Sequence, residues 1–254
     1  MSPDVYEILP GALIVSDAHY SRRRPELLAF FRAILSGELE TPQLVLAGDI
    51  FDLLFGQIEK THRLNDEAVK ALRRISETVP VLYLEGNHDY NLSGLFPHAT
   101  VVPRSRQPFV CRFADTLLLM AHGDFNQTLT YSLYTAVIRN PVVLHLLNAI
   151  DTLGNGAIIR WLERYLEKKD DCYEIDDFEA LTRRHLEGVA MHGATVFVEG
   201  HYHQGVTFAF DGLRYINLPA FACNRKYVMV SKARAERTFA WQIVQWKEAR
   251  GSGT

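Results

Sequence analysis

The sequence predicts an α/β sandwich, and three observations support this fold class. Short apolar runs and helical patterns alternate in the order β-α-β-α-β over the first third of the chain. Such alternation is typical of a largely parallel sheet with helices on both faces. From residue 109 strand patterns follow one another directly, and a helical segment without strand patterns interrupts them. We therefore expect a sandwich that carries a helical insertion.

The first half contains three predicted strands and two predicted helices. Each strand is a short apolar run that ends in a polar cluster, at residues 12–16, 43–49 and 79–89. The helices are predicted over residues 25–35 and 64–78 from their apolar spacing. Pro25 suits the first turn of a helix, where its missing N–H costs nothing.

The second half is predicted to be mainly β. The stretch FVCRFADTLLLMAHGD, which starts at Phe109, indicates two strands joined by a turn at Asp115. A hairpin turn is predicted at Asp211-Gly212, because this dipeptide favours tight β-turns. Further short strands are expected at residues 195–199, 205–210, 213–217 and 226–230, and a less regular one at 237–246.

Residues 125–190 form the predicted insertion. They are rich in Leu, Ile, Tyr and Arg, with breaks at Asn140-Pro141 and at Gly154-Asn155-Gly156. We predict a core of residues 1–124 and 191–250 and a helical cap of residues 125–190. The cap's Leu stripe has two interpretations: it packs on the sandwich, or it lines a cleft.

Composition excludes several classes of protein. With 254 residues, 48% of them hydrophobic, the chain can bury a substantial core, and its net charge of −3 argues against a nucleic-acid binder. The N-terminal stretch is acidic where a signal peptide would be basic, and no apolar run reaches the ~18 residues of a membrane span. We expect a cytoplasmic protein, with peripheral contact at the inner membrane left open. The sequence predicts three unpaired core thiols in a reducing compartment, at Cys111, Cys172 and Cys223.

Five segments place metal-type ligands directly after apolar runs. They are Asp17-Ala-His19, Gly48-Asp49, Gly86-Asn87-His88-Asp89, His122-Gly-Asp124 and Gly200-His201-Tyr202-His203. Each alone is weak, because Gly-Asp is a common turn and two histidines after a strand can be half-exposed turn residues. Together they are informative, since ligands of open α/β sheets bind beyond the carboxyl ends of the strands.

The residue types indicate two divalent metal ions. Carboxylate, amide and imidazole ligands suit Mn²⁺, Fe²⁺ or Zn²⁺, and the absence of cysteine from these segments argues against a structural zinc site. Two metals ~3.5–4 Å apart need a bridging carboxylate and clamp a phosphoryl group. His201 and His203 alternate along an extended chain, so both can face the metals.

In this order, DAH, GD, GNHD, HGD and GHYH resemble the motifs of the calcineurin-like metallophosphoesterases. The resemblance implies a four-layer α/β/β/α sandwich and two metal sites that share Asp49. One metal would be held by Asp17, His19, Asp49 and His203, and the other by Asp49, Asn87, His122 and His201. His88 would be catalytic, stabilising or protonating the leaving oxygen, and Asp89 would orient it.

The insertion, with HGDFNQTLTYSLYTAVIRNPVVLHLLNAID followed by IIRWLERYLEKKD, resembles the cap of the UDP-2,3-diacylglucosamine pyrophosphohydrolases of lipid A synthesis. That family cuts its lipid-linked nucleotide into UMP and 2,3-diacylglucosamine 1-phosphate, generally with Mn²⁺. Its diacylated substrate needs an apolar cleft, which a helix pair can supply. The implied substrate-binding residues are Asn87, His88, Tyr131, Arg139, Arg160 and Arg164.

Two departures keep other functions open. Members of that family commonly read GNRD and GHTH where this chain has GNHD and GHYH, and the His88 form is the general phosphoesterase pattern. The alternatives are hydrolysis of soluble nucleotides or phosphoproteins, and a non-catalytic scaffold, although scaffolds typically lose metal ligands. The chain has no long basic stripe with interleaved aromatics, which argues against a nuclease. No obligate protein partner is inferred.

Overall fold

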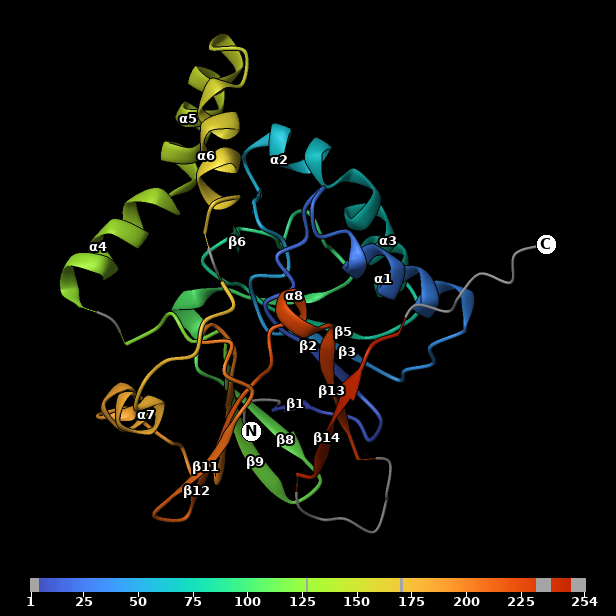
Figure 1. Ribbon diagram of the computed structural model, residues 1–254, viewed down its shortest axis with the longest axis vertical. Helices are drawn as coiled ribbons and strands as arrows, with labels where there is room; N and C mark the ends of the chain where they lie inside the picture. Colours follow the sequence, from blue (N-terminus) through green and yellow to red (C-terminus); the bar gives the residue numbers. More distant parts are fainter. Residues whose placement is uncertain (1–4, 127, 170, 232–238, 248–254) are drawn as a thin grey trace.

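Two six-stranded sheets packed face to face form the body of the protein (Figure 1). The computed structural model describes residues 5–126, 128–169, 171–231 and 239–247. The first sheet has the order β14 (Trp241–Gln245), β13 (Lys226–Val230), β2 (Leu13–Val15), β3 (Leu44–Leu46), β5 (Val81–Leu84), β7 (Thr100–Val102). The second has the order β1 (Tyr6–Glu7), β8 (Phe109–Phe113), β9 (Thr116–Ala121), β10 (Val196–Glu199), β12 (Leu213–Asn217), β11 (Thr207–Phe210).

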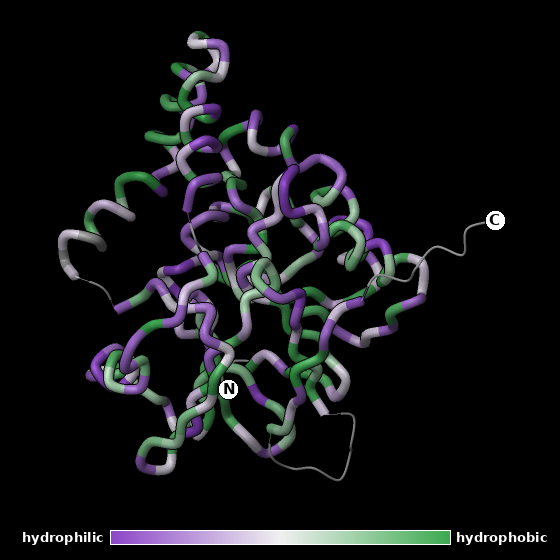
Figure 2. Tube along the Cα trace, in the orientation of Figure 1, coloured by the Kyte–Doolittle hydropathy of each residue, from purple (hydrophilic) through white to green (hydrophobic). Residues whose placement is uncertain are grey.

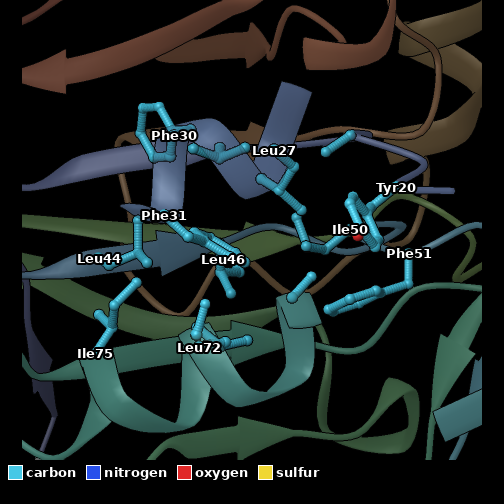
Figure 3. Packing of buried hydrophobic residues seen from close by; sticks show 14 of the residues in the cluster. Tyr20, Leu27, Phe30, Phe31, Leu44, Leu46, Ile50, Phe51, Leu72 and Ile75 are labelled. Atoms are coloured by element: carbon cyan, nitrogen blue, oxygen red, sulfur yellow. The ribbon is translucent and has the colours of Figure 1, made fainter. Parts of the chain in front are cut away.

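Helices α1 (Glu26–Ser36) and α3 (Asp66–Ser76) cover the outer face of the first sheet. Phe30 and Phe31 of α1 lie on one side of Leu46 in β3, and Leu72 of α3 approaches it from another (Figure 3). Strands β2, β3, β5 and β7 are parallel, as the alternating pattern predicts. The expectation of helices on both faces of this sheet was wrong, because the second sheet covers its inner face.

The interior between the sheets is apolar and holds them together. Ile14 and Val45 of the first sheet belong to the same buried cluster as Met120 and Val198 of the second. Removing such side chains from water stabilises the fold by ~25 cal/mol per Å² of apolar surface. On the outer face of the second sheet, Phe178 packs with its aromatic residues. The four-layer α/β/β/α sandwich is thereby confirmed.

Three helices, α4 (Leu129–Ile138), α5 (Pro141–Leu153) and α6 (Ala157–Leu166), project from the sandwich as a cap (Figure 1). The predicted break at Asn140-Pro141 begins α5: the Asn140 side chain accepts hydrogen bonds from the backbone N–H groups of Val142 and Val143. A small buried cluster joins cap to core, with Leu144 and Ile159 against Phe55. The predicted cap range also includes α7 (Phe178–Leu186), which packs on the second sheet instead.

Two of the cap helices, α4 and α5, are rich in apolar residues. Within the described residues, no helix by itself has the length and apolar composition of a span. Helices α5 and α6 have the required length and apolar composition only when they are taken together. This pair bends by 102° at the break between the two helices. Figure 2 shows hydrophobic segments along α4 and α5.

Several short elements were not predicted, and they surround the strand ends. They are β4 (Leu54–Phe55), which pairs with β6 (Asp89–Tyr90), the helices α2 (Glu59–Leu64) and α8 (Phe221–Asn224), and a 3₁₀ turn (Arg104–Arg106). Elements of two to six residues are too short to give a readable periodicity. Their positions are set by tertiary contacts.

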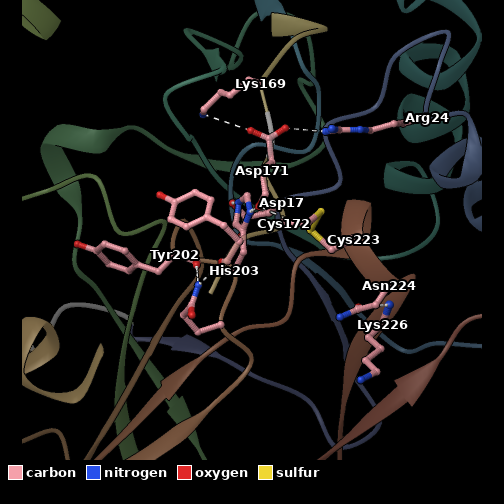
Figure 4. The surroundings of a disulfide bond; sticks show 12 residues. Asp17, Arg24, Lys169, Asp171, Cys172, Tyr202, His203, Cys223, Asn224 and Lys226 are labelled. Carbon is pink, nitrogen blue, oxygen red and sulfur yellow. Dashed lines mark hydrogen bonds and ion pairs between the residues drawn. A yellow bond between two sulfur atoms is a disulfide. The ribbon is translucent and has the colours of Figure 1, made fainter. Parts of the chain in front are cut away.

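The prediction of three unpaired thiols was wrong for two of them. Cys172, which follows the cap, forms a disulfide with Cys223 of α8, and Cys111 is unpaired and buried in β8 (Figure 4). The two partners are 51 residues apart in sequence. Residue 172 lies beside α8 only because the chain returns from the cap to the core there. The spacing of the cysteines in the sequence therefore could not predict this disulfide.

Candidate metal centre

Glycines let the ligand loops approach one another at the ends of the strands. A Cβ atom at Gly86 would collide with the Asp49 carboxylate, and one at Gly200 would collide with Asp17. Glycine is therefore required before the candidate ligands, because there is no room for a side chain at these positions. A larger residue at either position would push a carboxylate out of place.

Five candidate ligands have a left-handed backbone. The φ angles are 49° at Asp17, 43° at His19, 50° at Asp49, 64° at His201 and 63° at His203. This region costs of order 1–3 kcal/mol for a non-glycine residue and persists only where the surroundings hold it. Here backbone hydrogen bonds between the loops hold it, since Asp17 N donates to Gly48 O (3.1 Å) and His19 N to Asp49 O (2.9 Å).

One group of ligands combines Asp17, His19 and His203, whose ligand atoms lie within 4.8 Å of one another. His203 Nε2 is 3.1 Å from Asp17 Oδ1. The other ring nitrogen of His203, Nδ1, contacts the carbonyl oxygen of Asp171. That contact keeps a proton on Nδ1 and turns Nε2 toward the group, where Nε2 can bind a metal once it has lost its own proton.

A second group combines Asp49, His122 and His201, again within 4.8 Å. His122 Nε2 lies 3.4 Å from Asp49 Oδ2 and 3.2 Å from Asn87 Oδ1, which brings Asn87 to this group. Asp49 Oδ2 is also 4.0 Å from His19 Nε2. Its carboxylate thus lies between the two groups, where a bridging ligand belongs.

These residues fit two divalent cations. His19 Nε2 is buried and has no hydrogen-bond partner, which a metal ion would provide. The donor set is carboxylate, amide and imidazole, as the sequence predicts. When bound, two such metals activate water and stabilise charge on phosphoryl oxygens.

Asp52 orients two of the histidines and was missed from the sequence. Its carbonyl oxygen lies 2.9 Å from His88 Nδ1, and its carboxylate Oδ1 lies 3.2 Å from His19 Nδ1. Each contact fixes the orientation of one of the two imidazole rings, so that its Nε2 atom points away from Asp52. A carboxylate three residues after Asp49, in GDIFD, is the signal that could have identified it.

The predicted role of Asp89 in orienting His88 needs correction. The carboxylate of Asp89 is fully buried and accepts hydrogen bonds from the backbone N–H groups of Asp49, Ile50 and Gly86. Burial, followed by the charge of Asp49, raises the pKa of Asp89 to about 7. Asp89 therefore shapes the Asp49 loop, and Asp52 is the residue that contacts the His88 ring.

The family model for calcineurin-like phosphoesterases matches residues 12–205, a segment that contains every candidate ligand. The chain belongs to this family. It is a metal-dependent phosphoesterase, and the family uses divalent metal ions.

Two curated relatives carry a narrower name. A protein of Pseudomonas putida is 24% identical over 196 residues, which cover 76% of this phosphoesterase and 81% of the relative. A protein of Pseudomonas fluorescens is 27% identical over 198 residues, which cover 76% and 78%. Both are named UDP-2,3-diacylglucosamine hydrolase. Among solved structures, the E. coli phosphoesterase Yfce has a TM-score of 0.44 at 14% identity, covering 92% of this chain and 98% of its own.

Arg139 of the phosphoesterase, a predicted substrate-binding residue, is largely buried and contacts the core. Its side chain is 12% exposed, and Nη2 binds Asp124 Oδ2 (2.8 Å) and the carbonyl oxygen of Gly86 (3.0 Å). The guanidinium also lies over the ring of Tyr90, 5.0 Å from its centroid. Arg139 therefore ties the end of α4 to the loop that carries Asn87.

The other predicted substrate residues have different surroundings. Arg160 and Arg164 are exposed on α6 and line a cavity of about 480 Å³ with Arg22 and Arg23 of the core. We call it the arginine cavity. Tyr131 belongs to α4, but its side chain lies outside the described residues. Asn87 lines two further cavities, and His88 lines one of these two.

Two cavities meet at Asn87. The metal cavity, about 330 Å³, contains ligands of both groups and is further lined by Lys169, Asp171, Tyr173, Ile175, Leu181 and Tyr202. The apolar cavity, about 300 Å³, contains His88 and is lined mainly by Leu53, Phe55, Ile58, Tyr90, Leu144, Leu147, Ile159 and Leu162. It runs between the cap and the core, and Asn87 lines both cavities.

Metal binding is expected to release protons at neutral pH. Burial lowers the pKa of His122 and His203, but Asp49 and Asp17 outweigh it and raise the two pKa values to about 10 and about 9 in the metal-free protein. Both rings are then protonated at pH 7, whereas a metal ligand must be neutral. Affinity for Mn²⁺ should therefore be higher at pH 8 than at pH 6.

Calorimetric titration at pH 7, in buffers with different ionisation enthalpies, should report release of about two protons. Affinity that did not change between pH 6 and pH 8 would contradict the assignment.

The stability of the metal-free fold should also depend on pH, for the same reason. The raised pKa values of His122 and His203 mean that their protonated rings stabilise the metal-free fold. This stabilisation is complete below pH 6.5 and is lost as the pH rises through about 9 to 10.

Proposed function

We propose that this phosphoesterase hydrolyses the pyrophosphate bond of UDP-2,3-diacylglucosamine, giving UMP and 2,3-diacylglucosamine 1-phosphate, with Mn²⁺ as the metal and Fe²⁺ or Zn²⁺ as alternatives. One observation carries the proposal: an apolar cavity opens beside the metal ligands and contains His88. A phosphoesterase of small, charged substrates has no need of such a space. The names of the curated relatives support the same substrate.

The position of His88 supports one orientation of the proposed substrate. A residue that protonates or stabilises the leaving oxygen must lie on the leaving-group side. Because His88 lines the apolar cavity, the acylated sugar phosphate is the leaving group. Water attacks the α-phosphorus, the bond from that phosphorus to the bridging oxygen breaks, and the oxygen leaves with the sugar phosphate.

Acyl chains are expected to improve the substrate strongly. Each buried methylene contributes ~0.8 kcal/mol, and 1.4 kcal/mol is a factor of ten, so two methylenes already approach that factor. We predict that kcat/KM for the diacylated substrate exceeds that for UDP-glucosamine by more than tenfold. Leu147→Gln should erase most of this preference, because Leu147 lines the apolar cavity.

Leu133→Gln provides the matched control. Leu133 is on α4 with 67% of its surface exposed and does not line the apolar cavity. It should keep the preference, and both variants should hydrolyse a small chromogenic phosphodiester normally. If diacylated and deacylated substrates were cut equally well by the wild type, the lipid assignment would be wrong.

The direct test is incubation with UDP-2,3-diacylglucosamine and Mn²⁺, with UMP as the measured product. A panel of soluble nucleotides and a phosphopeptide tests the alternative. Rapid release of UMP from the lipid substrate alone supports the proposal. Equal or faster turnover of soluble nucleotides would replace it with a soluble-substrate phosphoesterase.

The same substrate implies contact with a membrane surface, and we extend the proposal to peripheral binding at the inner membrane. Large apolar side chains are exposed on the cap, among them Val137, Val142, Leu146 and Leu153. The exposed basic residues Arg160, Arg164, Lys168 and Lys169 lie on or just after α6 and can meet anionic headgroups.

Vesicles of anionic phospholipid should bind the wild type. Leu153→Glu should weaken that binding, because the Leu153 side chain is 89% exposed. Equal binding would contradict it.

A further inference from the structure

A short segment between the cap and α7, residues 171–175, forms one wall of the metal cavity. We call it the strap. Asp171 binds Arg24 (2.8 Å) and Lys169 (3.3 Å), and the next residue, Cys172, is bonded to Cys223 of α8 (Figure 4). The strap is therefore attached to the core where it enters the site.

Gln204 attaches the other half of the strap. Its Oε1 accepts a hydrogen bond from Ile175 N (2.9 Å), and its Nε2 donates to the carbonyl oxygen of Tyr173 (3.1 Å). Tyr173 thus has a fixed backbone. Its side chain nevertheless remains 60% exposed while lining the metal cavity. The backbone that carries this aromatic side chain is therefore held at the cavity wall before a ligand binds.

Tyr202 supplies a second aromatic wall. Its ring packs against Phe178 (5.3 Å between centroids), His185 (5.6 Å) and His201 (5.1 Å). These contacts fix the ring beside a metal-ligand candidate. Ile175 and Leu181 add apolar surface to the same cavity, and Lys169 adds a cation.

We infer that the metal cavity holds the nucleoside half of the substrate, with the base packed against Tyr173 and Tyr202. This inference rests on the proposed function and names the residues that select the nucleotide. Aromatic side chains offer a π-face on which a base stacks. His88 does not line this cavity, so the group retained after cleavage occupies it while the leaving group occupies the apolar cavity.

The arginine cavity is a poorer site for the nucleoside. No member of the two ligand groups around Asp17 and Asp49 lines it, and Asp52 is its link to the centre. Arg23 there is already paired with Glu167 at 2.9 Å. A nucleoside bound in that cavity would place its phosphate away from both ligand groups.

Tyr173→Ala tests the inference, with Tyr165→Ala as the matched control. Tyr165 is equally exposed, at 61%, but lies on α6 and does not line the metal cavity. Tyr173→Ala should weaken UMP binding to the Mn²⁺-loaded protein about tenfold, equivalent to 1.4 kcal/mol. Ribose 5-phosphate, which has no base, should bind both proteins equally, and Tyr173→Phe should behave as wild type.

Turnover adds a second readout. Tyr173→Ala should lower kcat/KM for the UDP-linked substrate about tenfold and leave a base-free alkyl phosphodiester within twofold. Equal losses for UMP and ribose 5-phosphate, or no loss for either, would overturn the inference. UMP binding is measured without the lipid. If the enzyme did not hydrolyse the lipid substrate, the UMP measurement would therefore still test the nucleoside site.

Discussion

Asp49→Asn is expected to remove most of the bound metal and to lower turnover by several orders of magnitude. The Asp49 carboxylate lies between the two ligand groups, 4.0 Å from His19 Nε2 and 3.4 Å from His122 Nε2. Asparagine removes one negative charge from between two dications, so both sites weaken together. The fold should survive, because the side-chain oxygen of asparagine can still accept the hydrogen bond from His88 N, now 2.8 Å.

Metal content per chain, turnover of a chromogenic phosphodiester and a thermal unfolding curve together test this prediction. Asp211→Asn is a suitable control, because Asp211 is exposed in a hairpin turn with φ of 44°, a conformation that asparagine also adopts. The control should retain metal and activity. An Asp49→Asn protein with two metals and full turnover would show that another residue bridges them.

The fold was predictable from the sequence where periodicity and strand-end chemistry agree. The runs that end at Asp17 and Asp49 became adjacent parallel strands, so their polar ends had to meet. The short elements β4 and β6 were not predictable, since a two-residue strand has no period. Helix α7 lay within a uniformly helical range, and only its packing on Phe197 and Tyr215 assigns it to the core.

The site was less predictable than the fold, because contacts decide which role a polar residue takes. Arg139 was expected at the substrate, yet its Nη2 binds Asp124 and a carbonyl oxygen of the core. Asp89 was expected beside the His88 ring, yet it accepts hydrogen bonds from backbone N–H groups. Sequence spacing gives the residue type and the loop, but it does not give the partner.

His88→Ala is expected to lower kcat ~10²–10⁴-fold, the usual contribution of one general acid or charge-stabilising group. Metal content should stay near normal, because His88 contacts Asp52 and is not needed by either principal ligand group. His88 does form a further cluster with His19 and Asp52. If the His88→Ala protein lost a metal ion as well as turnover, that cluster would be a metal site and His88 a ligand.

His88→Arg separates the two chemical roles of the histidine. Arginine supplies a positive charge but cannot give up a proton. If charge stabilisation dominates, His88→Arg should retain much more activity than His88→Ala, and equal losses would favour proton donation. The pH profile decides independently. Burial lowers the pKa of His88, so a required proton would make kcat/KM fall as pH rises through a value below 6.5. His88→Arg should lack this fall, whereas a profile that is flat in both proteins would exclude His88 as the acid.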